Sequence, residues 1–166
     1  SLNPTGRVAA PQRQTNSQRA QQVETTFNYG TSASQVEMLK VNLLHEQNYT
    51  GTGVTVAVLD NGFPGVNTTP AFARLNDNGL IAGGYNFVQR SNDVYTGGTH
   101  GTIVLSDMAG YVEGQLVGTA PDASYYLFVT EDVAAENPVE ESYWVEAAEM
   151  ADSLGVDILN TSLGYY

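Results

Sequence analysis

The apolar residues of this chain fall into short runs that are separated by glycines and polar turn residues. After the break at Gly51-Thr52-Gly53, residues 54–59 form a continuous run of β-branched and other apolar side chains. A run without polar alternation predicts a strand that is buried on both faces, as in a parallel sheet covered by helices. Three further runs predict strands of the same sheet, of which the first is weakened by a Gly-Gly pair: residues 81–88, 124–129 and 156–161. We expect the last run to be an interior strand.

Helical spacing appears first between residues 34 and 46. Ser34 and Glu37 match a capping box, in which each side chain pairs with a backbone N–H that the helix leaves unsatisfied. Four apolar residues then recur at helical spacing and predict one apolar face: Val36, Leu39, Leu43 and Leu44. We interpret His45 as an ordinary residue at the end of this helix.

Two more helices are predicted between the strands, over residues 99–109 and 140–154. In the second, Glu140 and Glu141 lie in the first turn, where the helix dipole favours anions. Five of its residues share a face: Trp144, Ala147, Ala148, Ala151 and Leu154. Strands that alternate with helices predict an α/β fold, a parallel β-sheet flanked by helices on both faces.

Composition narrows the class of protein. The 166 residues suit one domain, and a 42% apolar fraction is enough for a buried core. The net charge of −12 argues against nucleic acid and anionic membranes as partners, since both require clustered Lys and Arg. No apolar run approaches the roughly 18 residues of a membrane span. Because there is no cysteine, disulfides, thiolate metal sites and a Cys nucleophile are excluded.

Residues 1–28 differ from the rest of the chain. They hold five glutamines and three of the six basic residues, and they lack a clear hydrophobic period. Low hydrophobicity without periodicity predicts a flexible N-terminal extension, followed by the folded domain over residues 29–166.

Two residues stand out as candidates for chemistry. Asp60 ends the first predicted strand, and carboxyl ends of strands are where α/β sheets bind ligands, although Asp60-Asn61-Gly62 is also favourable turn chemistry. His100 lies in a glycine-rich loop at the predicted start of a helix, where the dipole is expected to lower its pKa and keep the imidazole neutral. An acid and a histidine are part of a nucleophilic triad, in which the acid orients the imidazole and the imidazole accepts a proton from a hydroxyl.

Four segments in this order resemble the subtilisin-like serine peptidases. The segment Val56-Ala57-Val58-Leu59-Asp60-Asn61-Gly62 resembles the Asp box of that family, and Thr99-His100-Gly101-Thr102 resembles its His box. The segment Gly118-Thr119-Ala120-Pro121-Asp122-Ala123-Ser124 is similar to the turn and strand that follow, and residues 156–164 are similar to a strand that ends in Ser-Leu-Gly. Two departures are Asn61, where the family usually has Ser or Thr, and Ile103, where many members have a second His.

The resemblance implies the N-terminal half of a subtilisin-like peptidase domain. Asp60 would then orient His100 as general base, and Ser162, Leu163 and Gly164 would pair with an extended polypeptide substrate and form one wall of its side-chain pocket. The nucleophilic Ser and the oxyanion Asn are expected from a C-terminal segment beyond residue 166, so that the chain alone would be inactive. An exported protein whose signal has been removed, extracellular or periplasmic, is implied. No cofactor is required; structural calcium occurs in the family, but no ligand loop with the right spacing is recognisable here.

Some alternatives remain open. Gly30-Thr31-Ser32-Ala33-Ser34 resembles the box around the family's nucleophile, but Ser34 is better explained as a helix cap and different residues follow. The chain could also be a non-catalytic binding or scaffold module that retains the fold. An unrelated nucleotide-binding α/β domain is disfavoured because no phosphate-cradling loop follows a strand. Finally, an acidic stretch suggests a preference for Lys- or Arg-containing peptides: Glu131, Asp132, Glu136, Glu140 and Glu141.

Overall fold

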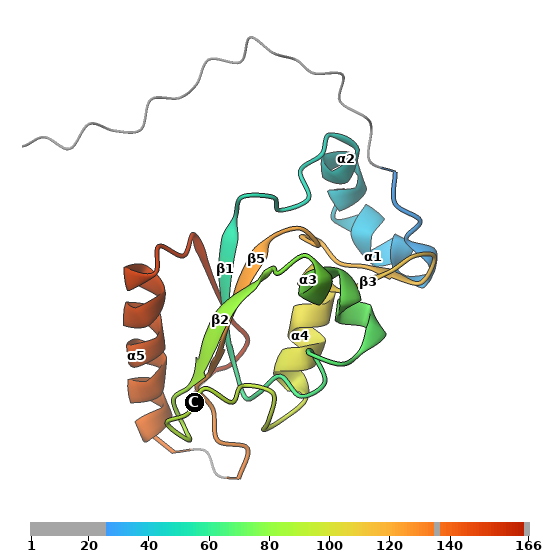
Figure 1. Ribbon diagram of the computed structural model, residues 1–166. Helices are drawn as coiled ribbons and strands as arrows, with labels where there is room; N and C mark the ends of the chain where they lie inside the picture. Colours follow the sequence, from blue (N-terminus) through green and yellow to red (C-terminus); the bar gives the residue numbers. More distant parts are fainter. Residues whose placement is uncertain (1–25, 135–136, 165–166) are drawn as a thin grey trace, which may run out of the picture.

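A four-stranded parallel sheet forms the centre of the protein in a computed structural model that describes residues 26–134 and 137–164 (Figure 1). The strands lie in the order β2-β5-β1-β6, and every neighbouring pair is parallel. Their bounds are β1 Thr55–Asp60, β2 Ile81–Asn86, β5 Ser124–Val129 and β6 Ile158–Thr161. This order places β1, the most continuous apolar run, between two neighbouring strands. Both of its faces are apolar because core clusters cover the sheet on both sides.

Helices cover both faces of the sheet, as the sequence predicts. α4 (His100–Ala109) and the short elements η2 (Pro70–Phe72) and α3 (Ala73–Asp77) pack on one face, and α5 (Val139–Ser153) packs on the other (Figure 1). Because side chains alternate along a strand, Val56 and Val58 of β1 face α4, whereas Ala57 and Leu59 face α5. The fold class expected from the sequence is therefore confirmed.

The predicted helix over residues 34–46 is instead two short helices, α1 (Ala33–Met38) and α2 (Val41–Glu46), which follow the single turn η1 (Gly30–Ser32). Lys40 between them has a left-handed backbone (φ 57°), which breaks the predicted apolar face. Val36 is buried, but the other three residues of that face are exposed: Leu39, Leu43 and Leu44. The predicted capping box is also wrong, because α1 begins at Ala33, so that Ser34 lies within the helix rather than at its cap.

His45 is not an ordinary helix-end residue, because it is completely buried. Its Nε2 donates to the carbonyl oxygen of Thr119 (2.9 Å), and its Nδ1 accepts from the Tyr29 hydroxyl (2.9 Å). Phe27 packs edge-on against the imidazole, with 5.1 Å between ring centroids. The predicted flexible extension over residues 1–28 lies mostly outside the described residues, but its last part, from Phe27, packs on the domain through this cluster.

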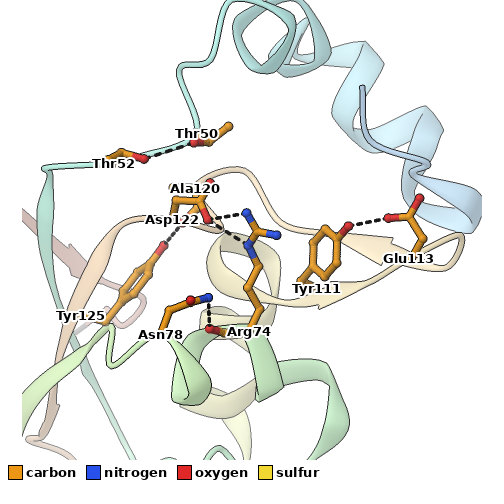
Figure 2. Close-up of polar contacts among 9 residues, drawn as sticks. All are labelled: Thr50, Thr52, Arg74, Asn78, Tyr111, Glu113, Ala120, Asp122 and Tyr125. Carbon is orange, nitrogen blue, oxygen red and sulfur yellow. Dashed lines mark hydrogen bonds and ion pairs between the residues drawn. The ribbon is translucent and has the colours of Figure 1, made fainter. Parts of the chain in front are cut away.

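Several elements near the amino-terminal edge of the sheet are too short to show a hydrophobic period and were not predicted. They are η2 and α3 and a small antiparallel hairpin of β3 (Tyr111–Val112) and β4 (Leu116–Val117). Arg74 of α3 joins these parts: its Nε and Nη2 donate to Asp122 Oδ1 (2.8 and 2.6 Å), and its guanidinium lies 4.7 Å from the centre of the Tyr111 ring (Figure 2). Since Asp122 precedes β5, this cluster stabilises the end of the sheet where β5 begins.

β6 lies at the edge of the described sheet, so its predicted interior position is not observed there. Ile158 and Leu159 are about half exposed. On α5, Ala147 and Ala151 are fully buried as the shared face predicts, but Leu154 of that face is exposed. α5 ends at Ser153 and Leu154 is its C-cap, so Leu154 lies shortly before β6, the edge strand of the described sheet.

Candidate active site

Asp60 is the last residue of β1, and its side chain is completely buried. Directly after the neighbouring strand β5, the Thr130 N–H donates to the Asp60 carbonyl oxygen (3.0 Å). The Asn61 N–H donates to Asp60 Oδ1 (2.7 Å). Buried polar oxygens need hydrogen-bond donors, so the strand end gives the Asp60 side chain both a fixed position and one of its partners.

His100 is the first residue of α4, and its imidazole lies directly against this carboxylate. Nδ1 is 2.9 Å from Asp60 Oδ1 and 3.0 Å from Oδ2. A carboxylate can only accept, so Nδ1 carries the proton and Nε2 keeps its lone pair when the ring is neutral. The His100 side chain is 49% exposed while that of Asp60 is fully buried, which leaves the ring open to a reacting group. The two residues, 40 positions apart in sequence, are thus brought together as predicted.

Glycines allow the strand and the helix to approach this closely. Gly62 and Gly97 form an isolated antiparallel bridge, and the Gly98 N–H donates to the Asn61 carbonyl oxygen (3.0 Å). A Cβ atom at Gly101 would lie 2.4 Å from the Gly62 carbonyl oxygen and 2.9 Å from Asp60 Cβ. From the sequence, these glycines are recognisable only as a loop around His100. The close approach of Gly101 to Asp60 becomes visible only in the fold.

The pKa of His100 is raised above its usual value. The largest cause is the hydrogen bond to Asp60, followed by the negative charge of that residue; partial burial opposes the shift, and the charge of Glu131 adds to it. The lowering expected from the helix dipole is therefore wrong in direction, because a carboxylate in direct contact outweighs a partial charge. In the sequence Glu131 is recognisable only as part of an acidic stretch, and its influence on His100 becomes visible only in the fold.

The three predicted substrate-binding residues follow β6, which is the neighbour of β1. They therefore lie at the same edge of the sheet as Asp60, because the strands are parallel and Leu59 pairs with Thr161. Leu163 lines an open hollow of about 530 Å³ together with Glu141, Trp144, Val145 and Thr161. Ser162 is exposed and donates to Asn160 Oδ1 (3.3 Å), and Gly164 has open space where a side chain would be.

Ser32, the alternative nucleophile, lies elsewhere. Its Oγ donates to the Tyr29 carbonyl oxygen (2.8 Å) and accepts from the Val117 N–H (3.2 Å), and the residue is buried. Val117 follows the C-terminal end of α4, whereas His100 begins that helix, and a ten-residue helix is about 15 Å long. Ser32 is thus a structural residue. Among the described residues, no contact joins the neighbouring Ser34 to Asp60 or His100.

The described ranges, 26–134 and 137–164, contain neither a candidate metal cluster nor a candidate membrane-spanning helix. No group of three or more His, Asp or Glu side chains is arranged to hold a metal ion there. Likewise, none of the helices in this part of the chain has the length and apolar character needed to cross a membrane.

Comparison with known proteins places this chain in a family. The model of the subtilase family matches residues 51–165, a range that contains both Asp60 and His100. The chain belongs to the subtilase family. Among curated subtilases, it is 32% identical over 131 residues to Subtilisin E of Bacillus subtilis (strain 168) and 30% identical to Subtilisin of Bacillus pumilus, with 78% of the chain covered in both cases.

Solved structures share the fold. The crystal structure of MycP1 with its N-terminal propeptide removed has a TM-score of 0.60 and 25% identity, and the match covers 77% of this chain and 37% of MycP1. The chain spans 32% of the length of Subtilisin E and 44% of the subtilisin from Bacillus pumilus. The matching region is thus well under two thirds of each of these relatives.

Proposed function

We propose that this chain supplies the acid and the general base of a subtilisin-like serine endopeptidase, and that the nucleophilic serine comes from a segment beyond residue 166. The observation that carries the proposal is the buried Asp60 carboxylate in contact with Nδ1 of a half-exposed His100. Membership of the subtilase family supports it, as does the greater length of the relatives.

In the proposed reaction, Nε2 of His100 removes the proton from the serine hydroxyl as that oxygen attacks the peptide carbonyl. The imidazolium that forms is stabilised by Asp60, which also holds the ring in the required tautomer. His100 then gives the proton to the leaving amine, and the acyl-enzyme is hydrolysed by water that the same imidazole activates. An Asn in the same C-terminal segment is proposed to donate to the oxyanion. The chemistry uses side chains alone and requires no cofactor; a structural calcium site would lie outside this pair.

We propose that Ser162, Leu163 and Gly164 bind the substrate in extended form. Gly164 has no side chain to block a peptide backbone, and Leu163 together with Trp144 gives the neighbouring hollow an apolar lining. Such a surface suits an apolar side chain of a polypeptide. As the family resemblance implies, we expect the enzyme to be exported from the cytosol.

A serine-directed fluorophosphonate probe tests the proposal. Residues 1–166 alone should take up no probe and cleave no peptide, whereas the protein that includes the C-terminal segment should be labelled on a serine of that segment. His100→Ala in the longer protein should reduce peptide hydrolysis by about 10⁴–10⁶-fold. Ser32→Ala is the matched control and should leave hydrolysis within a few-fold of the unmodified protein.

Two results would contradict the proposal. Labelling of a serine within residues 1–166 would show that the nucleophile is in this chain. A folded longer protein that takes up no probe and hydrolyses no peptide would instead favour a non-catalytic binding module.

A further inference from the structure

A groove of about 220 Å³ lies between α1, the C-terminal end of α4 and the β3–β4 hairpin. Its lining is mainly apolar and includes Val36, Leu39, Leu116 and Val117. Sites for drug-sized ligands measure roughly 300–1,000 Å³, so this groove suits a single side chain. His100 lies at the opposite end of α4, and a ten-residue helix is about 15 Å long, so the groove is separate from the candidate active site.

Two polar side chains at the groove determine what it can bind. Asp107 of α4 and Gln35 of α1 both line it and are both exposed. In the described part of the chain, no cation forms an ion pair with Asp107, because Arg74 and Arg90 pair with other carboxylates. An apolar lining beside a carboxylate suits a side chain that has an apolar stem and a cationic end.

The cations of this protein are concentrated in the N-terminal segment, residues 1–25, which lies outside the described range. This segment holds three of the six basic residues and a single acid, Glu24, so its net charge is 3 − 1 = +2. The remainder of the chain, residues 26–166, has 3 basic and 17 acidic residues and a net charge of 3 − 17 = −14. Opposite charges on the two parts favour contact between them.

The N-terminal segment joins the described chain close to the groove. The Asn28 carbonyl oxygen accepts from the Gly114 N–H (2.9 Å) in the turn of the β3–β4 hairpin, and Leu116 of the same hairpin lines the groove. Arg19 is nine positions before Asn28, and nine extended residues span up to about 30 Å. Since a short loop loses less entropy on closure than a long one, Arg19 is favoured over the two earlier arginines.

The acidic stretch between β5 and α5 is a poorer site for these cations. Glu140 is buried, and its Oε1 accepts from the Asp132 N–H (2.8 Å), so it fixes the loop rather than forming a charged surface. Asp132 Oδ1 in turn accepts from the Ala134 N–H (2.9 Å). Glu136 lies outside the described residues. This stretch also follows the carboxyl end of β5, whereas the hairpin that contacts Asn28 lies near the amino-terminal edge of the sheet.

We propose that the groove binds the side chain of Arg19 and thereby docks the N-terminal segment on α1 and α4. The aliphatic stem of the arginine packs on Leu39 and Leu116, and its guanidinium donates to the Asp107 carboxylate. This contact covers Leu39, a large apolar side chain that is 65% exposed in the described part of the chain. The proposal concerns the fold of the segment and does not depend on the peptidase function.

Limited digestion of the intact chain with trypsin tests this docking. Trypsin must bind the arginine side chain in its own specificity pocket, so a docked arginine is protected from cleavage. Mass spectrometry gives the rates of cleavage after Arg19 and after Arg13 in the same sample. Asp107→Asn should accelerate cleavage after Arg19 roughly fivefold, and Leu39→Ala should also accelerate it, while cleavage after Arg13 stays unchanged. High salt should accelerate cleavage after Arg19 in the unmodified protein.

Two matched controls alter equivalent groups away from the groove. Asp152→Asn makes an equal change of charge on the exposed face of α5, and Leu44→Ala makes an equal change of size on the exposed face of α2. Neither should change the rate of cleavage after Arg19. If Asp107→Asn also leaves this rate unchanged, or accelerates cleavage after Arg13 equally, the groove does not bind Arg19. Protection that increases with protein concentration would place the segment on a second copy and overturn docking within one chain.

A cross-linking measurement tests the same contact without altering Arg19 or Asp107. Because the protein has no cysteine, a pair of introduced cysteines can form one disulfide only. Ala20→Cys combined with Gln35→Cys should oxidise roughly fivefold faster than Gln14→Cys combined with Gln35→Cys, since docking raises the effective concentration of residue 20 at the groove. Equal rates for the two pairs would contradict the proposal.

Discussion

Substitution of Gly101 by Ala should separate His100 from Asp60. The new Cβ atom would lie 2.4 Å from the Gly62 carbonyl oxygen, and 2.9 Å from both Asp60 Cβ and Phe63 Cε1. None of these neighbours is the end of a flexible side chain, since Gly62 contributes backbone and Phe63 is fully buried. Relief of the contact with Gly62 to an ordinary van der Waals distance requires α4 and the end of β1 to move apart by about 1 Å.

A movement of that size is enough to break the contact between His100 and Asp60. The distance from His100 Nδ1 to Asp60 Oδ1 is now 2.9 Å, and an increase of about 1 Å takes it beyond hydrogen-bonding range. Because this hydrogen bond is the largest cause of the raised pKa of His100, the pKa should fall towards its usual value of about 6.5. Overpacking costs about 1–3 kcal/mol of folding free energy, which the higher helix propensity of Ala offsets by about 1 kcal/mol.

The assay is a pH titration of the His100 ring proton by NMR, with chemical denaturation to measure the free energy of unfolding. Ile103→Ala, on the exposed face of the same helix, is the control and should leave the pKa of His100 unchanged. If Gly101→Ala is folded and its His100 titrates as in the unmodified protein, close packing at this glycine does not set the geometry of the pair.

Three further predictions concern pH and stability. Hydrolysis by the longer protein should increase with pH as His100 loses its proton, with the midpoint of the profile above pH 6.5. Asp60→Asn should shift this midpoint downwards and reduce kcat by about 10⁴-fold. A midpoint that Asp60→Asn leaves unchanged would contradict the pairing of the two residues. Since the folded-state pKa is raised, the Asp60–His100 pair stabilises the fold fully below pH 6.5 and loses this contribution as pH rises through the folded-state pKa, which denaturation at several pH values can measure. His45→Ala removes both hydrogen bonds and the ring packing of His45, and should lower the free energy of unfolding by about 3 kcal/mol. Tyr29→Phe removes only the hydrogen bond to Nδ1 and should lower it by about 1 kcal/mol. Equal losses would show that the Thr119 hydrogen bond and the ring packing of His45 contribute nothing.

The sheet and its helices could be predicted because their hydrophobic patterns are long. β5 spans the six residues that the sequence indicates, and α4 and α5 each begin within one residue of the predicted start. The helix over residues 34–46 was misread because its pattern is periodic across Lys40, whose left-handed backbone has no signature in composition. Short elements such as α3 and the β3–β4 hairpin lack enough residues to show a period.

In the candidate site, too, some residues could be predicted from the sequence and others could not. Asp60 and His100 could be identified because each lies at a strand or helix terminus that the sequence marks clearly. His45 could not, since its burial depends on Phe27 and Thr119, which are distant in sequence. The direction of the His100 pKa shift was also missed, because the helix dipole is visible in a predicted helix and a contact distance is not.

The strand order β2-β5-β1-β6 has a consequence for the time course of folding. β1 has no sequence-adjacent strand beside it, and the Thr55 N–H donates to Asp157 Oδ2 across a separation of 102 residues. Pairing of segments that are far apart in sequence loses conformational entropy before the stabilising contacts form, so topologies of this kind fold slowly. During synthesis, β1 emerges long before β5 and β6, so its apolar residues remain unpaired until those strands are made. We therefore expect transient exposure of this strand on the ribosome, during which binding by a chaperone would increase the yield of folded protein.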